Sequence, residues 1–298
     1  MRQVKGSSAA LFPGFTAIRI DTEEVTINGV MGGSGPPLLL LHGYPQTHAE
    51  WHRIAPALAQ RFTVIATDLR GYGDSSKPAD GRHHEGHCKR SMARDQIAVM
   101  RKLGFARFAV VGHDRGGRVA HRMALDHPDA VSRVAVLDIV PTYRLYTSVT
   151  KEFATVYYHW FFLIQPAPTP ETLIAGNEDF YLRFGMFRGL VPGVIPDHVY
   201  AEYLRCYQDP ATLHAMCEDY RAGASIDLEH DKADLHVKVR CPLLAIWGGK
   251  GAMEPLYDVL ETWRERASDV RGRSLPGGHW LPEQVQDDLT AELLAFLA

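Results

Sequence analysis

Apolar runs with strand and helix periodicity alternate along most of the chain. The run Pro37–Leu41 is apolar at every position, which is typical of a strand buried on both faces of a parallel sheet. Similar runs predict strands at Thr16–Ile20, Glu24–Val30, Phe62–Thr67, Phe108–Val111, Val134–Leu137, Leu243–Trp247 and Arg273–Leu275, the first two as a hairpin. Helical spacing predicts helices at Trp51–Gln60, Ser91–Leu103, Arg115–Leu125, Leu256–Ala267 and Asp287–Leu297. This alternation indicates an α/β fold with a mostly parallel sheet and helices on both faces.

The middle of the chain departs from this alternation. Residues 143–231 have helical patterns throughout, are rich in aromatic side chains and contain Pro166, Pro168 and Pro170. This composition predicts a helical cap over a pocket, inserted into a core domain formed by residues 1–142 and 232–298. Many of the aromatic residues are expected to do no more than pack this cap against the core.

Composition and charge exclude several classes of protein. The 298 residues are 46% hydrophobic and 22% charged, and the net charge of −3 provides no basic surface for nucleic acid or an anionic membrane. No apolar run reaches the roughly 18–20 residues of a membrane-spanning helix, and the N-terminal residues lack the apolar stretch of a secretory signal. A cytoplasmic protein is expected.

Cysteine and histidine patterns give no predicted metal site. Cys88, Cys206, Cys217 and Cys241 are widely spaced and contain no C-x-x-C pair, so they are expected to be packing residues or free thiols. The cluster RHHEGHC at residues 82–88 suggests a metal site. Its glycine implies no fixed ligand geometry, and a polar surface loop is the favoured interpretation. No metal and no cofactor are predicted.

Four short motifs follow predicted strands in a characteristic order. They are His42–Pro45, the glycine-rich turn Asp68–Ser75, the turn Gly112–Gly117 and the segment Gly277–His279. Together they resemble the α/β-hydrolase fold over essentially the whole chain. The resemblance implies an eight-stranded, mostly parallel sheet with an inserted helical cap.

The turn Gly112–Gly117 has an aspartate where many hydrolases of this fold have a serine. Glycines on both sides of Asp114 let the turn take strained dihedral angles and present the side chain at the carboxyl edge of the sheet. His279 is the candidate base. The backbone N–H groups of Tyr44 and Arg115 are the expected oxyanion donors.

The acid that orients His279 has two candidate positions. After the seventh strand, where relatives have W-G-x-x-D, the run Trp247–Gly251 ends in glycine, and Glu254 comes three residues later. At the end of the sixth strand the sequence contains Asp138. We therefore expect Asp138 to orient His279, with Glu254 as the alternative.

An aspartate nucleophile defines the chemistry of the site. A carboxylate attacks saturated carbon that carries a leaving group and forms an ester, which water activated by His279 then hydrolyses. Arg115 and Arg118 lie at the start of the following helix, where two guanidinium groups can bind one substrate carboxylate. In the cap, His159, Trp160 and Tyr220 offer N–H and O–H donors for a departing halide.

These motifs resemble those of the fluoroacetate dehalogenases. The segments that carry the resemblance are His113–Arg118, Leu137–Thr142, His159–Trp160, Asp219–Gly223 and Leu275–His279. The resemblance implies hydrolysis of a small 2-halocarboxylate, fluoroacetate or chloroacetate, to glycolate and halide. It assigns Asp114 as nucleophile, Arg115 and Arg118 as carboxylate binders, and His159, Trp160 and Tyr220 as the halide site. It also implies a homodimer. The sequence departs from the family mainly in peripheral loops such as Met186–Val194.

Two other functions remain open at this point. An epoxide hydrolase uses the same nucleophile and needs cap tyrosines, for which Tyr157, Tyr158 and Tyr220 are available. The paired arginines argue against a neutral epoxide. A non-catalytic binding protein of the same fold is disfavoured by the complete set of Asp114, His279 and Asp138.

Overall fold

Eight strands form one sheet in the computed structural model, which describes residues 8–298. The strand order is β1-β2-β4-β3-β5-β6-β7-β8, with β1 and β2 antiparallel to their neighbours and all other pairs parallel. The strands are β1 (Thr16–Asp21), β2 (Thr26–Gly32), β3 (Pro37–Leu41), β4 (Thr63–Thr67), β5 (Phe108–His113), β6 (Val131–Leu137), β7 (Leu243–Gly248) and β8 (Val270–Leu275). The predicted mostly parallel sheet, including the hairpin, is confirmed.

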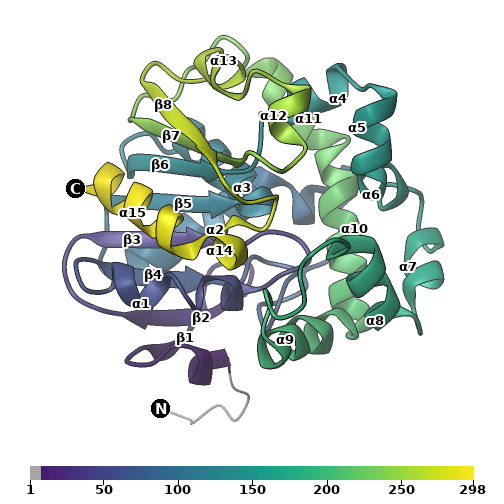
Figure 1. Cartoon of the computed structure of the whole chain (residues 1–298), viewed down its shortest axis with the longest axis horizontal. Coiled ribbons are helices and arrows are strands. Elements are labelled where there is room, and N and C mark those ends of the chain that lie inside the picture. The colour runs from purple at the N-terminus through teal and green to yellow at the C-terminus, as the bar shows by residue number, and fades with distance from the viewer. Residues whose placement is uncertain (1–7) are drawn as a thin grey trace.

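Helices cover both faces of this sheet (Figure 1). On one face lie α2 (Lys89–Lys102), α3 (Asp114–Asp126) and α13 (Val259–Arg264), and on the other lie α1 (Ala55–Leu58), α14 (Leu281–Gln284) and α15 (Gln286–Leu297). Leu39 and Leu41 of β3 pack toward the first set, whereas Leu38 and Leu40 pack toward the second. A strand between two apolar layers must be apolar at every position, which explains the uninterrupted run in β3.

Two predicted helices are each divided in the structure. The predicted helix Trp51–Gln60 is a 3₁₀ turn, η2 (His48–Trp51), followed by the short α1. The predicted helix Leu256–Ala267 is α12 (Met253–Leu256) followed by α13, whose first turn is capped by the side chain of Asp258. An aspartate that accepts a backbone N–H starts a new helix rather than continuing the previous one. Those two predictions were therefore wrong in their boundaries.

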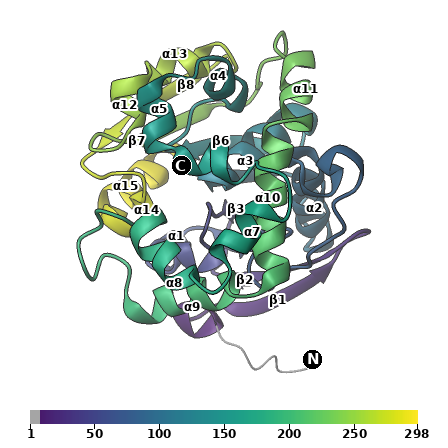
Figure 2. The ribbon, with the colours of Figure 1, turned by 90° about the vertical axis from the view of Figure 1, so that its right-hand side faces the viewer.

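A continuous helical segment joins β6 to β7. It contains α4 (Thr142–Thr147), α5 (Lys151–Val156), α6 (Tyr158–Phe162), α7 (Thr169–Ile174), α8 (Glu178–Phe180), the π-helix η4 (Tyr181–Met186), α9 (Asp197–Tyr207), α10 (Pro210–Gly223) and α11 (Ile226–Ala233). Figures 1 and 2 show α5 to α10 gathered on one side of the sheet. We call this segment, residues 142–233, the helical insertion. The domain division at 143–231 stays a prediction.

The remaining predictions about the whole chain concern membranes and thiols. In residues 8–298 no helix is both long enough and apolar enough to cross a membrane. All four cysteines lie in this range and are free thiols; three are buried and Cys241 is partly exposed. This agrees with the prediction of packing residues or free thiols.

Candidate active site

The turn between β5 and α3 holds Asp114 in a strained backbone conformation. Its φ of +44° lies in the left-handed region that non-glycine residues rarely adopt. The turn packs tightly against neighbouring backbone. If Gly116 carried a Cβ atom, it would lie 2.3 Å from the Leu41 carbonyl oxygen, and a Cβ on Gly112 would lie 2.3 Å from the Gly116 carbonyl oxygen. The glycines therefore allow the close approach that presents the Asp114 side chain at the carboxyl end of the sheet.

The Asp114 carboxyl is buried among positive charges. The backbone N–H of Tyr44 donates to Asp114 Oδ1 at 3.1 Å. Burial alone would raise the pKa of this carboxyl, but the charges of His279, Arg118 and Arg115 lower it to about 2. Asp114 is thus ionised at neutral pH without the help of a base.

His279 and Asp138 meet opposite Asp114. His279 Nδ1 lies 2.6 Å from Asp138 Oδ2, and the N–H of Gly248 donates to Asp138 Oδ1 at 2.8 Å. Asp138 has a φ of +50°, so it too sits in a strained turn at the end of its strand. The alternative acid, Glu254, accepts from Trp247 Nε1 at 3.2 Å and is exposed. The structure therefore places Asp138, and not Glu254, on His279.

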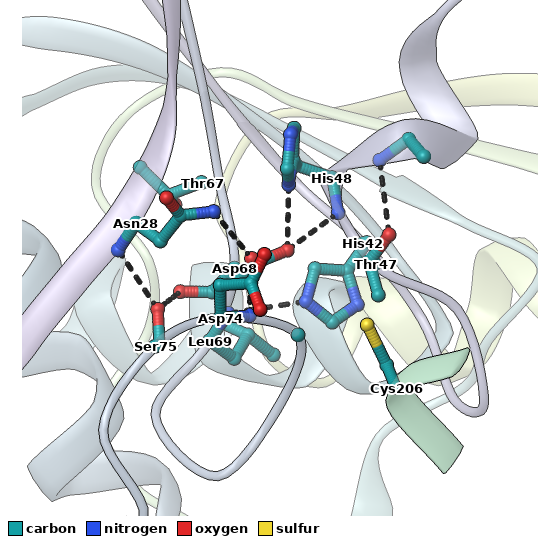
Figure 3. Close-up of polar contacts among 12 residues, drawn as sticks. Asn28, His42, Thr47, His48, Thr67, Asp68, Leu69, Asp74, Ser75 and Cys206 are labelled. Carbon is teal, nitrogen blue, oxygen red and sulfur yellow. Dashed lines mark hydrogen bonds and ion pairs between the residues drawn. The ribbon is translucent and has the colours of Figure 1, made fainter. Parts of the chain in front are cut away.

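Asp68 anchors the loop that carries Tyr44 (Figure 3). The Asp68 carboxylate accepts from the backbone N–H of His48 at 2.9 Å, and its Oδ1 lies 2.7 Å from His48 Nδ1. It also accepts from Asn28 Nδ2 at 2.8 Å and from the N–H of Asp74 at 3.0 Å. Burial would raise the pKa of this carboxyl, but His48 lowers it strongly. The glycine-rich turn Asp68–Ser75 thus supports the loop after β3.

His42 joins the same two loops from the other side. Its Nε2 accepts from the N–H of Leu69 at 3.1 Å, so its Nδ1 carries the proton and donates to the Gly43 carbonyl oxygen at 2.8 Å. Burial lowers the pKa of His42, which keeps the ring neutral. Its place next to Asp68 is visible in Figure 3. The ring therefore fixes the backbone from which the Tyr44 N–H points at Asp114.

Glu50 and His113 form a buried pair that sequence reasoning missed. Glu50 Oε1 lies 3.1 Å from His113 Nδ1, and Glu50 Oε2 accepts from the N–H of Gly43 at 2.9 Å. His113 Nε2 donates to the His279 carbonyl oxygen at 2.8 Å. Burial would lower the pKa of His113, but Glu50 raises it to about 9. The pair connects the loop of Tyr44 to the loop of His279, and a histidine directly before Asp114 was the sequence signal for it.

The two arginines of α3 differ in their partners. Arg115 is fully buried and pairs with Asp219 of α10: its Nε lies 2.8 Å from Asp219 Oδ2, and Nη2 donates to Oδ1 at 2.8 Å. Arg118 Nη1 donates to the Val140 carbonyl oxygen at 3.1 Å and to Thr142 Oγ1 at 3.0 Å. In the described part of the chain, Arg115 Nη1 and Arg118 Nε are buried without a hydrogen-bond partner. Each arginine thus keeps at least one nitrogen that donates to none of the described residues.

The aromatic residues predicted to bind halide lie together. The ring of Tyr220 is 5.7 Å from that of His159 and 6.0 Å from that of Trp160, measured between centroids. Trp160 Nε1 and Tyr220 Oη are buried and have no hydrogen-bond partner within residues 8–298. Burial lowers the pKa of His159 to about 3, so its ring is neutral at neutral pH. The arrangement offers buried donors for which the described residues supply no acceptor.

Guanidinium groups lie over the same aromatic rings. Arg118 Cζ is 4.5 Å from the ring centroid of Trp160, and Arg115 Cζ is 4.2 Å from that of Tyr220. Contacts of this kind are favourable, especially when they are desolvated. The arginines of the core and the aromatic residues of the helical insertion therefore form one buried cluster.

A cavity of about 970 Å³ opens beside Asp114. Asp114, His159 and His279 line it together with Tyr157. Its lining also includes Met186, Arg188, Gly189, Leu190, Val191 and Val194, from the segment Met186–Val194. Trp160, Tyr220 and Arg118 are buried and do not line it. The segment where we expect the sequence to depart from the dehalogenases therefore lines the cavity and is not part of the buried cluster.

The fold and the strained aspartate turn identify the class of protein. The sequence profile of the α/β-hydrolase fold matches residues 36–284. The chain therefore belongs to the α/β-hydrolase family, as its motifs predicted.

Individual relatives show which members of the family this chain is similar to. A fluoroacetate dehalogenase from Burkholderia sp. is 47% identical over 97% of this chain and 95% of its own length. The soluble epoxide hydrolase of Corynebacterium sp. (strain C12) is 36% identical over 94% of this chain and 98% of its own. A crystal structure of an assigned α/β hydrolase from Nostoc sp. PCC 7120 has a TM-score of 0.94 and 56% identity, covering 95% of this chain and 98% of that one. The predicted resemblance to fluoroacetate dehalogenases is confirmed.

Proposed function

We propose that the protein hydrolyses the carbon–halide bond of a haloacetate, fluoroacetate or chloroacetate, and releases glycolate and halide. One observation carries this proposal. An ionised aspartate faces a buried cluster in which Trp160 Nε1 and Tyr220 Oη lack partners among the described residues. Buried donors without an acceptor are costly, so they favour a ligand that brings one.

In the first step the Asp114 carboxylate displaces the halide. The Tyr44 N–H already donates to Oδ1, so Oδ2 is the oxygen that attacks the carbon bearing the halogen. The new carbon–oxygen bond forms as the carbon–halogen bond breaks, and the halide leaves with the bonding electrons. Trp160, Tyr220 and neutral His159 would donate to the departing halide.

In the second step water hydrolyses the ester on Asp114. His279, oriented by Asp138, takes one proton from the water as its oxygen attacks Cγ of Asp114. The charge that develops on Oδ1 is stabilised by the N–H groups of Tyr44 and of Arg115, which lies in the first turn of α3 and has no helical acceptor. The departing alkoxide takes the proton from His279, and the Asp114 acid loses the second water proton to solvent.

The substrate carboxylate would bind to the unused N–H groups of Arg118 and Arg115. These groups belong to two cations beside the nucleophile, and they have no partner in the described structure. Such contacts would hold the neighbouring carbon against Asp114 for in-line attack. A carboxylate one bond from the reacting carbon is the feature that distinguishes a haloacetate from a neutral haloalkane.

Trapping the ester tests the mechanism directly. The His279→Ala variant incubated with chloroacetate or fluoroacetate should release about one halide per protein and gain the mass of a carboxymethyl group on the peptide that contains Asp114. The Asp114→Asn variant is the control and should release no halide in the burst. An unmodified Asp114 peptide in His279→Ala would contradict the mechanism.

Epoxide hydrolysis is the second candidate. The similarity to the Corynebacterium enzyme favours it, and so does Tyr157, whose buried ring lies 6.4 Å from that of His279 in the cavity lining. Tyr158 does not line the cavity. Incubating the protein with a haloacetate and, separately, with a simple epoxide distinguishes the two reactions. An epoxide hydrolase would form diol from the epoxide and release no halide from the haloacetate. The buried arginines favour the haloacetate.

Three further expectations accompany the proposed function. We propose a cytoplasmic enzyme that works as a homodimer without metal or cofactor in the reaction. Analytical ultracentrifugation of the purified chain tests the dimer, which should sediment at twice the mass of 33.3 kDa.

A further inference from the structure

The histidine-rich segment is not the simple surface loop that the sequence suggested. Residues Arg82–His87 form the 3₁₀ turn η3, which packs against helix α10 of the helical insertion. His83 is exposed, but His87 is only 1% exposed. Helix α7 lies against α10 on the same side of the molecule (Figure 2). Segments from the core and from the insertion therefore meet here, outside the site around Asp114.

Three of the side chains at this contact have the spacing of metal ligands. One ligand atom from each of Asp80, His214 and Glu218 lies within 4.8 Å of the other two. His214 Nε2 is 3.1 Å from Asp80 Oδ1 and 3.2 Å from Asp80 Oδ2. Two ligands bound tetrahedrally to Zn²⁺ at about 2.0–2.1 Å are roughly 3.4 Å apart. The His214 and Asp80 atoms could therefore bind one ion with little movement, and Glu218 lies within reach of the same ion.

Further hydrogen bonds hold the candidate ligands in place. His214 Nδ1 lies 2.9 Å from Glu171 Oε1, so its Nε2 is directed at Asp80. Arg221 donates to both Glu171 oxygens, at 2.7 and 3.0 Å, and to Glu218 Oε1 at 2.9 Å, so it holds both carboxylates in place. A carboxylate behind the second nitrogen of a histidine is the usual support of a metal-binding imidazole.

The side chain of His87 gives separate evidence that a ligand binds at this cluster. Neither of its ring nitrogens has a hydrogen bond within residues 8–298, although the side chain is buried. Its Nε2 points toward Asp80, with 3.7 Å to Oδ1. On the other side of the cluster, His84 Nδ1 lies 2.6 Å from Glu218 Oε2. A buried imidazole without a partner is costly, and a metal ion between His87 and Asp80 would remove that cost.

We propose that Asp80, His214 and Glu218, completed by His87, bind a first-row transition-metal dication of the Zn²⁺ type. Imidazole and carboxylate ligands suit Zn²⁺, Co²⁺ and Ni²⁺ better than Mg²⁺ or Ca²⁺. Asp80 and His87 belong to the core, and His214 and Glu218 belong to α10, so the ion links the two. Of the histidine-rich segment 82–88, this proposal uses only His87 as a ligand.

Such an ion would stabilise the folded protein. It binds ligands that are close together only in the native structure, so binding shifts the folding equilibrium toward that structure. Asp80 and His214 are partly exposed, with side-chain exposures of 44% and 38%, so the ion can enter without unfolding. The site would act on stability and leave the chemistry at Asp114 to the residues described above.

Metal titration of the untagged, chelator-treated full chain tests the proposal. We expect one Co²⁺ per chain with visible absorption typical of bound ligands, displacement by Zn²⁺, and a rise of a few degrees in the unfolding midpoint. His214→Ala and the milder Asp80→Asn, both at partly exposed positions, should each weaken binding at least tenfold. Circular dichroism of each variant checks that the fold is retained.

Two control variants make the outcome decisive. His236→Ala removes an exposed histidine away from the cluster and should leave binding unchanged. Cys88→Ser disrupts a second group of close ligand atoms, Cys88, Asp227 and His230, and should also leave it unchanged. The proposal is overturned if no equivalent binds, if His214→Ala and Asp80→Asn bind as the wild type does, or if only Cys88→Ser abolishes binding.

Discussion

Trp160 and Tyr220 keep two polar hydrogens buried without an acceptor from the described residues. A buried donor that is left unsatisfied costs roughly 1–3 kcal/mol. Under the proposed function the departing halide accepts from these donors, and fluoride needs this help more than chloride because it is smaller and more strongly hydrated. The donors should therefore matter most for the fluorinated substrate.

Variants that each lack one donor test whether the donors matter most for fluoroacetate. In Trp160→Phe and Tyr220→Phe the ring stays and the polar hydrogen is lost, so kcat for fluoroacetate should fall roughly 10- to 100-fold. The fall should be smaller for chloroacetate. Steady-state halide release with both substrates measures the ratio.

Tyr200→Phe is the matched control for these variants. Its hydroxyl donates to Asp179 Oδ1 at 2.8 Å, away from the cavity, so kcat should not change. Equal losses for fluoroacetate and chloroacetate in Trp160→Phe and Tyr220→Phe would contradict a role in releasing the halide.

At the scale of elements, Asp219 holds helix α10 to the start of α3. Its carboxylate pairs with Arg115 and Lys89 and accepts from Tyr72 Oη at 2.7 Å, and all of these groups are buried. Removing one charge from a buried network leaves the others unpaired. Because Tyr220 is the next residue, the position of this proposed halide donor depends on the same contacts.

The variant Asp219→Asn measures this anchor. The free energy of unfolding in urea should fall by about 3–5 kcal/mol, because Arg115 and Lys89 lose their shared partner. Asp179→Asn is the control: Asp179 pairs with Arg183 four residues away at a half-exposed surface, and its loss should cost less than about 1 kcal/mol. Similar losses in both variants would argue against the anchor.

The Glu50–His113 pair makes stability depend on pH in a defined direction. Folding raises the pKa of His113 from 6.5 to about 9, so the stabilisation is complete below pH 6.5 and is lost as the pH rises toward 9. The loss amounts to at most about 3 kcal/mol. Urea unfolding across this range should show a steeper decline for the wild type than for His113→Asn. Parallel curves would contradict the charged state of His113.

Sequence patterns predicted those parts of this fold and site that depend on local rules. Alternating apolar runs located all eight strands, and glycines at 112 and 116 indicated the tight turn around Asp114. Asp138 was preferred over Glu254 because it follows the sixth strand and because the W-G-x-x-D position after the seventh strand is glycine, and the structure pairs it with His279.

The missed features depend on contacts between distant segments. Asp219 lies 104 residues from Arg115, and nothing along the chain indicates that the two meet. Likewise, the burial of His87 results from α10 packing over η3. Periodicity reports which face of an element is buried, but not which element covers it.

At the scale of the whole molecule, the net charge of −3 is not evenly distributed, because two cations and one anion lie at the entrance of the cavity. Exposed Arg188 and Lys250 line the entrance of the cavity, with Glu152 as the opposing charge. An anionic substrate would be attracted toward this entrance, and salt would screen the attraction because the Debye length shortens from about 30 Å at 0.01 M to about 3 Å at 1 M.

Salt dependence of the rate tests this attraction. For chloroacetate, kcat/KM should fall several-fold between these ionic strengths, mainly through KM. The double variant Arg188→Gln and Lys250→Gln should start lower and depend less on salt. Arg264→Gln, at an exposed position outside the cavity lining, should behave as the wild type does. An unchanged salt slope in the double variant would contradict steering.

The Arg115–Asp219 pair also limits how this protein can be recombined with its relatives. The helical insertion enters and leaves the core between two neighbouring strands, so a chimera that exchanges residues 142–233 needs only two junctions. A donor segment without an acid at the position of Asp219 would leave Arg115 buried and uncompensated directly beside Asp114. Viable exchanges in evolution or in the laboratory must therefore transfer this acid with the helices, or replace Arg115 at the same time.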